Sequence, residues 1–387
     1  MNAIRSLRDT RVRLSALTLA LALALVPAPG SAQATAAQRE TRLDVPASID
    51  SARVILQSFL GQRHVPGLTA AVAVDGALVW TQGFGYADLE HMVPASPQTR
   101  WRIASISKTF TAVAAMQLLA QGKLDLDAPI QRWVPEFPPK RGPVTLRRLM
   151  SHTSGLRHYK GDEFMSDVHY DDVIAPIAVF AQDSLLFMPG ERYSYSTYGF
   201  TLVSAVVRRA SGEPFLDYLE EHVIRPAGLS SVGPERKDSI ILHHASFYLA
   251  DSLGVITKAP EVDLSNKWAG GGLLSTASDL VRWALAVSNH RVLSDSMTER
   301  MWTRQKLNDG TLGPYALGWR VETDAAGHRV VYHTGGAMGG GGVLYFYPDD
   351  GVAVAILGNL PIGYLAPARR IGELLEAAEG AGQTGSR

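Results

Sequence analysis

The sequence predicts an α/β protein of the α+β type, in which one antiparallel β-sheet is built from both chain ends, flanked by helices, and interrupted by a mostly helical insertion. Two observations predict this fold class. β-Hairpin patterns lie at opposite ends of the chain, and helical spacing of apolar residues fills the region between them. The 387 residues are 46% hydrophobic and 19% charged, an ordinary globular composition that allows a large core.

Each hairpin contains an Asp-Gly pair, which tolerates the positive φ of a tight turn. The first pair is Asp75-Gly76 and the second is Asp350-Gly351. The expected strands span residues 68–74, 77–83, 342–347 and 352–357, with a further strand at 329–334. Antiparallel segments from both ends can thus form a single sheet.

The central region has the spacing and loop composition of a helical subdomain. The expected helices span residues 105–121, 145–151, 171–182, 198–211, 214–223 and 276–287. We therefore expect a sheet-containing subdomain from residues 35–100 and 265–378 and a mostly helical subdomain over 101–264. A cleft between the two is the expected place for a site.

The first 34 residues have the pattern of a secretory signal peptide, because four arginines precede an apolar block over residues 14–26. The block is shorter than the roughly 20 residues of a membrane span. We expect cleavage after Ala34 and a secreted or periplasmic protein, with an uncleaved anchor as the alternative. Residues 35–45 and 379–387 are expected to be disordered tails.

Charge and cysteine content exclude several classes of function. The net charge of 0 becomes −3 without residues 1–34, which hold four arginines and one aspartate (0 − 3 = −3). This balance indicates neither a nucleic-acid partner nor a membrane partner beyond the signal peptide. The absence of cysteine excludes disulfides, a cysteine nucleophile and thiolate metal sites. No cofactor or metal is predicted, a small molecule or peptide is the expected substrate, and the oligomeric state stays open.

A serine and a lysine stand three residues apart at the start of the expected helix 105–121. In a helix, Ser105 and Lys108 are neighbours on one face, offset by about 4.5 Å along the axis. A serine hydroxyl needs a base to become a nucleophile, and a lysine can be that base only where burial lowers its pKa. The apolar residues around this helix predict such burial. The alternative is an N-cap serine with a solvated lysine.

A polar and aromatic loop over residues 187–200 supplies the second candidate group. A phenol near a serine and a lysine can relay a proton between nucleophile and leaving group, and Tyr195 is the candidate. The alternative is an aromatic cluster that packs the loop against the core, which fits Tyr193 and Tyr198 better than Tyr195.

The third candidate region is the expected strand at 329–334, which carries His333 and Thr334 and continues into Gly335 and Gly336. Glycines at a strand edge allow a substrate to approach closely and leave N–H groups for an oxyanion hole. His333 by itself would more often be structural. The chain has no dinucleotide or P-loop motif, no G-x-S-x-G and no H-E-x-x-H, and its scattered histidines lack metal-ligand spacing.

Taken in order, Ser105-Ile106-Ser107-Lys108, Tyr195-Ser196-Thr197 and His333-Thr334-Gly335 resemble three motifs of the penicillin-binding-protein and class C β-lactamase superfamily of S12-type serine hydrolases. These motifs are Ser-x-x-Lys, Tyr-x-Asn and Lys/His-Thr-Gly. The resemblance runs from about residue 50 to 375. SISK, YST and HTGG make the chain most similar to the serine β-lactamase-like subgroup related to the mitochondrial protein of animals, which is associated with peptidase-like activity.

The resemblance implies a β-lactamase/transpeptidase-like fold and a role for each matching residue. It implies that Ser105 is acylated, that Lys108 is its base, that Tyr195 is the relay and that His333 belongs to the catalytic set. It further implies an oxyanion hole from the backbone N–H groups of Ser105 and Gly336. The residues implied to contact substrate are Thr197, Thr334 and Gly335.

Two departures from the family pattern bear on the substrate. His333 stands where β-lactamases have lysine, and histidine is mostly neutral at pH 7, so a permanent cation for a substrate carboxylate is missing there. Arg157, Arg192 and Lys267 are the candidates to replace it. Thr197 stands in place of an asparagine that both donates and accepts hydrogen bonds. Both changes argue against efficient hydrolysis of β-lactams.

The predicted function is a secreted serine hydrolase that cleaves peptide amides or esters through an acyl-enzyme, with weak β-lactamase activity at best. The alternatives within this chemistry are an esterase, a D-aminopeptidase or D-Ala-D-Ala carboxypeptidase, and a true class C-like β-lactamase. An envelope binding or scaffold protein is the non-enzyme alternative. A metal-dependent hydrolase is the least supported.

Overall fold

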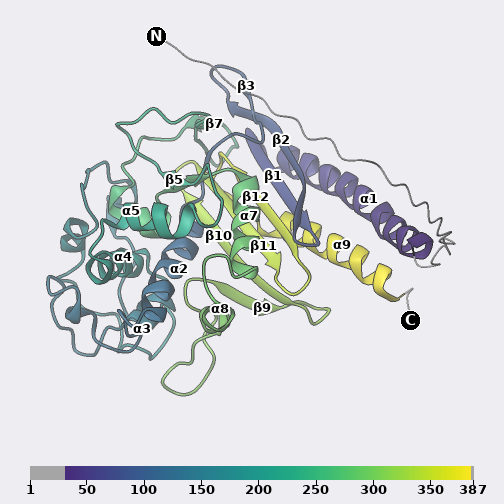
Figure 1. The fold of residues 1–387 in the computed structure, drawn as a ribbon. Helices are drawn as coiled ribbons and strands as arrows, with labels where there is room; N and C mark the ends of the chain where they lie inside the picture. Colours follow the sequence, from purple (N-terminus) through teal and green to yellow (C-terminus); the bar gives the residue numbers. More distant parts are fainter. Residues whose placement is uncertain (1–30, 385–387) are drawn as a thin grey trace, which may run out of the picture.

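The computed structural model describes residues 31–384, with side chains over 45–377, and has a seven-stranded antiparallel sheet with helices on both faces (Figure 1). The predicted signal peptide falls mainly on residues 1–30, outside the described part, and stays a prediction. Among the described residues, no helix has the length and apolar character that a membrane crossing requires.

The large sheet has the strand order β3-β2-β1-β12-β11-β10-β9. These strands are β1 Gly67–Val74, β2 Ala77–Asp88, β3 Val93–Pro94, β9 Arg320–Thr323, β10 Arg329–Ala337, β11 Gly340–Tyr347 and β12 Val352–Gly358. Both predicted hairpins are present, and Asp75 and Gly76 adopt the expected positive φ of 51° and 70°. β1 pairs with β12 along its length, so the prediction of one sheet from both chain ends is confirmed.

The central strand β12 is buried on both faces, which explains its continuous apolar sequence. Its residues alternate between two cores. Val352, Val354 and Ile356 pack beneath the helices α1 (Ser31–Arg63) and α9 (Leu365–Thr384), which lie side by side on one face (Figure 1). The intervening residues face the larger core, which α7 (Ala277–Ser288) helps to cover.

Helix occupies parts of both segments that the sequence predicts to be tails, since α1 includes residues 35–45 and α9 continues to Thr384. Alanine, glutamine, glutamate and arginine are common in these helices and are good helix formers. Each helix is anchored on the sheet and gains a hydrogen bond for each residue it adds, which favours a continuous helix.

The region between the hairpins is mostly helical, as predicted. Its α-helices are α2 Ser107–Ala120, α3 Leu146–Met150, α4 Thr197–Ser211, α5 Phe215–Leu219 and α6 Trp268–Gly271, followed by α7 and by α8 Asp295–Trp302. Short 3₁₀ and π turns are η1 Ala104–Ile106, η2 Ile130–Arg132, η3 Gly161–Met165, η4 Ala175–Val179, η5 Glu220–Ile224 and η6 Ser265–Lys267. The short strands are β4 Trp101–Arg102, β5 Gly233–Pro234, β6 Tyr248–Ala250, β7 Ile256–Lys258 and β8 Leu273–Ser275. The residue boundaries of the two subdomains stay a prediction.

One expected helix is wrong, because residues 171–182 contain only the 3₁₀ turn η4. The Asp172 carboxylate accepts hydrogen bonds from the backbone N–H groups of Ile174 and Ala175, which fixes a turn. Pro176 then removes an N–H donor and disfavours helical backbone at the residue before it. These local effects outweigh the apolar spacing that suggested a helix.

Candidate active site

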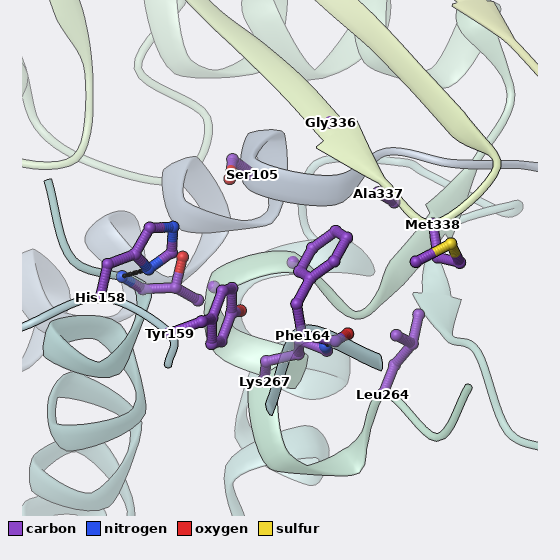
Figure 2. Close-up of a pocket in the computed structure, with 12 residues that line it drawn as sticks. Ser105, His158, Tyr159, Phe164, Leu264, Lys267, Gly336, Ala337 and Met338 are labelled. Atoms are coloured by element: carbon purple, nitrogen blue, oxygen red, sulfur yellow. Dashed lines mark hydrogen bonds between the residues drawn. The ribbon is translucent and has the colours of Figure 1, made fainter. Parts of the chain in front are cut away.

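A narrow cavity of about 60 Å³ lies where the end of β10, the turn η1 and the segment around α6 meet (Figure 2). It is lined by Ser105, His158, Tyr159, Phe164, Thr197, Leu264, Lys267, Gly270, Gly271, Gly336, Ala337 and Met338. The structure therefore brings the predicted nucleophile to the same cavity as Thr197 and Gly336, which are 92 and 231 residues further along the chain (197 − 105 and 336 − 105).

Ser105 and Lys108 have the relationship that their spacing predicts. The Lys108 Nζ lies 2.9 Å from the Ser105 Oγ, and Lys108 is completely buried in α2. Nζ also contacts two acceptors on other elements, the Gly270 carbonyl and, at 3.4 Å, the Thr197 Oγ1. The alternative of a solvated lysine beside a capping serine is therefore wrong.

The surroundings of Lys108 suit a general base. Burial holds the pKa of Lys108 well below its usual value, which favours the neutral amine. A neutral amine has two N–H bonds and one lone pair. The Gly270 carbonyl and the Thr197 hydroxyl can accept the two N–H bonds, which leaves the lone pair for the proton of Ser105.

The backbone at the nucleophile has an uncommon conformation. Ala104, directly before Ser105, has a φ of +48°, a left-handed value that a residue with a side chain seldom adopts. Such conformations persist where the surrounding structure fixes them, and they are frequent at functional sites. Ser107 donates to the Ala104 carbonyl at 2.6 Å and thereby holds this turn at the start of α2.

Two adjacent glycines of β10 have different functions at the site. A Cβ on Gly335 would lie 2.3 Å from the carbonyl oxygen of Ile103, so only glycine lets β10 approach the segment that leads into Ser105. A Cβ on Gly336 would meet no atom within 4 Å, because this residue faces the cavity. The strand thus presents an unobstructed backbone beside Ser105, the arrangement expected of an oxyanion site.

Tyr195 lies beside the pair formed by Ser105 and Lys108. The Lys108 Nζ is 4.9 Å from the centroid of the Tyr195 ring. Burial raises the pKa of the Tyr195 phenol, and its hydrogen bond with the Ser105 hydroxyl lowers it by a smaller amount. The phenol is consequently protonated at neutral pH and can donate a proton. The aromatic-packing alternative holds for Tyr198, whose ring stacks on Phe180 at 4.5 Å.

His333 is buried beside the cavity and is not among the residues that line it. Its Nδ1 donates to the Thr334 carbonyl at 2.6 Å, so in the neutral ring Nε2 accepts the hydrogen bond from the Tyr315 hydroxyl. Burial, together with the nearby Lys108, lowers the pKa of His333 to about 3. His333 is therefore neutral at pH 7, and both of its ring nitrogens are engaged. Thr334 and Gly335 likewise do not line the cavity.

Two of the histidines that lack metal-ligand spacing, His152 and His158, belong to this site. The ring of His152 packs 4.1 Å from that of Tyr195, and its Nδ1 accepts from the Ser196 N–H at 3.2 Å. The Nδ1 of His158 accepts from the Thr197 N–H at 3.3 Å, and His158 lines the cavity. Burial and the neighbouring Lys108 lower the pKa of His158 to about 4. A search for metal-ligand spacing misses such residues, because they orient the Tyr195–Thr197 segment as neutral hydrogen-bond acceptors.

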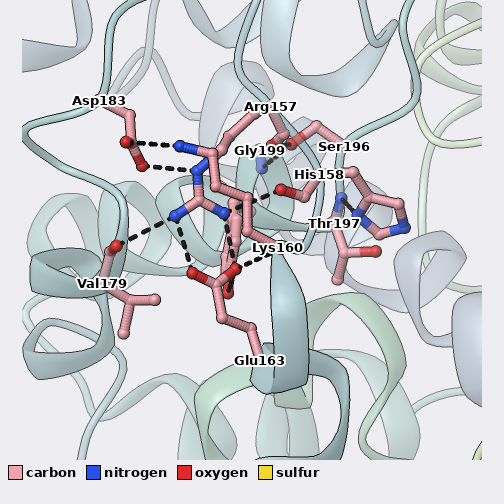
Figure 3. Close-up of polar contacts among 10 residues, drawn as sticks. Arg157, His158, Lys160, Glu163, Val179, Asp183, Ser196, Thr197 and Gly199 are labelled. Atoms are coloured by element: carbon pink, nitrogen blue, oxygen red, sulfur yellow. Dashed lines mark hydrogen bonds and ion pairs between the residues drawn. The ribbon is translucent and has the colours of Figure 1, made fainter.

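Of the three cations proposed to replace the family lysine, two are engaged elsewhere. Arg157 forms ion pairs with Glu163 and Asp183 (Figure 3). Arg192 stacks over the Phe187 ring at 4.7 Å and does not line the cavity. Lys267 does line it, with only 4% of its surface exposed.

Comparisons with known proteins identify the family of the chain and solved structures that share its fold. The family model described as Beta-lactamase matches residues 52–378. The chain is 31% identical to the human (Homo sapiens) serine beta-lactamase-like protein LACTB, mitochondrial, over 78% of this chain and 72% of that protein. Two solved structures share the fold at 25% identity. The octameric penicillin-binding protein homologue from Pyrococcus abyssi has a TM-score of 0.73, covering 86% of this chain and 77% of that one. The D-stereospecific amidohydrolase from Streptomyces sp. has a TM-score of 0.68, covering 79% and 93%.

Proposed function

Because the chain belongs to the β-lactamase family and is a serine hydrolase, we propose that it cleaves peptide amide or ester bonds through an acyl-enzyme on Ser105. The observation that carries the proposal is the 2.9 Å contact between the Ser105 Oγ and the amine of a completely buried lysine. Buried lysines with a lowered pKa are suited to take a proton from an attacking hydroxyl.

Acylation starts when the Lys108 amine takes the hydroxyl proton and the Ser105 Oγ attacks the substrate carbonyl carbon. The carbonyl oxygen becomes an oxyanion, which the backbone N–H groups of Ser105 and Gly336 stabilise from the cavity wall. As the tetrahedral intermediate breaks down, the bond to the leaving group is cleaved. Tyr195 gives its proton to the departing amine or alkoxide and receives one from the Lys108 ammonium.

Deacylation repeats these steps with water as the nucleophile. Lys108, neutral again, takes a proton from the water directly or through the Tyr195 phenol, and the hydroxide attacks the acyl carbon. The bond to the Ser105 Oγ then breaks, and the serine oxygen takes its proton from the Lys108 ammonium, which returns to the neutral amine. No metal ion is needed in this sequence, since each proton has a donor and an acceptor among the residues of the site.

We propose that β-lactams are poor substrates of this site. The neutral His333 is bonded to Tyr315, so the position where β-lactamases carry lysine supplies no cation. The cation that does line the cavity, Lys267, comes from a different element, the turn η6. Thr197 has one hydroxyl where an asparagine would offer both a carbonyl oxygen and an NH₂ group. Amide and ester substrates are the better candidates, and a solved neighbour of 25% identity is described as a D-stereospecific amidohydrolase.

The substrate class is tested with three chromogenic compounds, a 4-nitrophenyl ester, a D-amino acid 4-nitroanilide and a chromogenic cephalosporin. We expect the wild type to turn over the ester or the anilide, with a kcat/KM for the cephalosporin at least about tenfold lower than for the better of these two substrates. We expect Ser105→Ala to turn over none of the three compounds. Cephalosporin hydrolysis as the fastest reaction would refute the proposed preference. Turnover by folded Ser105→Ala would refute the mechanism.

We further propose that the protein is exported and that residues 1–34 are removed. The support is the N-terminal sequence of four arginines, an apolar block and the small residues before Thr35. Expression of the full chain in a bacterium with a periplasm, followed by fractionation and intact-mass measurement, tests this directly. The expected product is periplasmic and begins at or near Thr35, whereas an uncleaved cytoplasmic chain would contradict the proposal.

A further inference from the structure

Lys267 is a charged side chain in the active-site cavity that the proposed mechanism does not use. It ends the 3₁₀ turn η6 and lines the same cavity as Ser105, with 4% of its surface exposed (Figure 2). Lysine is seldom buried without a partner, because transferring an ammonium group out of water is costly. The position of Lys267 therefore requires an explanation in terms of what the cavity binds.

The contacts of Lys267 leave its charge without a counterion. Its Nζ donates to the Phe164 carbonyl at 2.8 Å and lies 5.1 Å and 5.0 Å from the rings of Tyr159 and Phe164. Among the described residues, no carboxylate forms an ion pair with it within 4.0 Å. Asp263, which acts on Lys267 electrostatically, instead accepts hydrogen bonds from Ser265 and His169.

The other walls of the cavity favour an anion. No aspartate or glutamate is among the lining residues, and His158 is neutral at pH 7 because burial and Lys108 lower its pKa to about 4. An ammonium group has three N–H donors, of which the Phe164 carbonyl takes one. The remaining donors and the charge can be satisfied by an anionic group that enters the cavity. The two aromatic rings stabilise the cation while the cavity is empty.

A purely structural role for Lys267 is poorly supported, because other bonds hold the neighbouring loop. The backbone N–H of Asp263 donates to the Ser166 carbonyl at 3.0 Å, and the Tyr170 N–H donates to the Ser265 hydroxyl at 2.9 Å. Glu163, within η3, is fixed by its ion pair with Arg157 (Figure 3). The bond from Lys267 to the Phe164 carbonyl is therefore one of several hydrogen bonds between residues 263–267 and residues 164–170.

We propose that Lys267 determines specificity by binding a carboxylate of the substrate while Ser105 attacks the scissile carbonyl. The substrate class is an ester or amide that carries a carboxylate within reach of the cavity, on either the acyl part or the leaving group. This inference rests on the proposed hydrolase function. Burial, together with the charge of Arg102, lowers the pKa of Lys267 to about 8, so most molecules carry the charged form at pH 7.

The test compares kcat/KM between two matched pairs of esters. One pair is the 4-nitrophenyl monoester of glutaric acid and its methyl-capped form, which places the carboxylate on the acyl part. The other pair is 3-acetoxybenzoate and its methyl ester, which places the carboxylate on the leaving group. The readout is the ratio of kcat/KM for the free acid to that for the methyl ester within each pair.

For the wild type, we expect a ratio above one in at least one pair. The pair with the higher ratio identifies whether Lys267 binds a carboxylate on the acyl part or on the leaving group. Lys267→Met should lower that ratio about 10- to 100-fold, the range expected for loss of one charge-assisted hydrogen bond. Lys267→Arg should retain part of the preference. Lys160→Met is the matched control, because Lys160 pairs with Asp183 and does not line the cavity, and its ratio should equal that of the wild type.

Three results would overturn the proposal. The first is a wild-type ratio of one or less in both pairs, and the second is a Lys267→Met ratio equal to that of the wild type. The third is an equal fall in kcat/KM for the free acid and the methyl ester in Lys267→Met, which would assign Lys267 a structural role. Failure of the proposed function is recognised separately, because an uncharged fluorophosphonate would then leave Ser105 unlabelled. In that case, calorimetry with glutarate on wild type and Lys267→Met still decides whether Lys267 binds a carboxylate.

Discussion

Replacing Gly335 by alanine should disable the site by moving the nucleophile, although Gly335 does not line the cavity. The new Cβ would lie 2.3 Å from the Ile103 carbonyl oxygen and 3.0 Å from the Ala104 Cβ, whereas ordinary contacts begin at 3.4 Å. The shortfall of 3.4 − 2.3 = 1.1 Å can be removed only by separating β10 from the segment that leads into Ser105. The Gly335 and Ile103 backbones both lie in a packed region and cannot move independently of it. The displacement therefore shifts the backbone of Ser105, two residues after Ile103.

The expected loss follows from this displacement. A misplacement of about 1 Å in a catalytic constellation costs on the order of 100-fold in rate. Overpacking of this kind costs about 1–3 kcal/mol of stability, which corresponds to a fall in Tm of about 2–6 °C. The assays are kcat/KM on a 4-nitrophenyl ester and thermal unfolding followed by circular dichroism.

Gly336→Ala is the matched control for stability, because a Cβ at that position meets no atom within 4 Å. Its Tm should stay within about 1 °C of the wild type, the size of effect expected for an uncrowded substitution. A Gly335→Ala protein with wild-type kcat/KM and wild-type Tm would refute the claim that this close approach positions Ser105.

Two further predictions concern a base and a buried ion pair. Lys108→Met should lower kcat/KM by about 10²–10⁴-fold, the contribution of a general base. Since burial lowers the pKa of Lys108 and the neutral amine is the active form, wild-type kcat/KM should rise with pH and level off well below pH 10.5; a rise centred on pH 10.5 would contradict this. Glu235→Ala should cost about 3–5 kcal/mol in urea unfolding at pH 7, because it leaves the buried Arg102 without its partner. Burial raises the pKa of Glu235, but hydrogen bonds from His244 and Arg102 lower it below 4.5 overall. The stability that Glu235 contributes should therefore diminish as pH falls through its folded-state pKa. An equal difference in the free energy of unfolding between wild type and Glu235→Ala at pH 7 and at pH 3 would contradict this prediction.

The sequence was sufficient for features that depend on local geometry. The three-residue spacing of Ser105 and Lys108 placed the amine within reach of the hydroxyl, and the apolar residues of α2 predicted the burial of Lys108. The two hairpins, each with an Asp-Gly turn, are likewise set by residues close in sequence. Their pairing into one sheet joins β1 with β12 from opposite chain ends, and it was predicted from the strand patterns at the two ends.

Features that depend on distant contacts could not be predicted in this way. Arg157, Arg192 and Lys267 are equivalent candidates in the sequence, and only the fold shows that Arg157 is held by Glu163 and Asp183. Lys267 reaches the cavity because η6 packs against the loop that contains Phe164, about 100 residues earlier. His333 was expected among the catalytic residues through the resemblance, but its bond to Tyr315 depends on a loop with no recognisable pattern.

The central claim is that Ser105 is an activated nucleophile, and intact-protein mass after incubation with a fluorophosphonate tests it most directly. Wild type and Ser105→Ala are compared at equal concentration, after circular dichroism confirms that both are folded. If Ser105 is an activated nucleophile, the wild type acquires a single covalent adduct and Ser105→Ala acquires none. An unmodified wild type, or an adduct of equal yield on Ser105→Ala, would contradict this assignment.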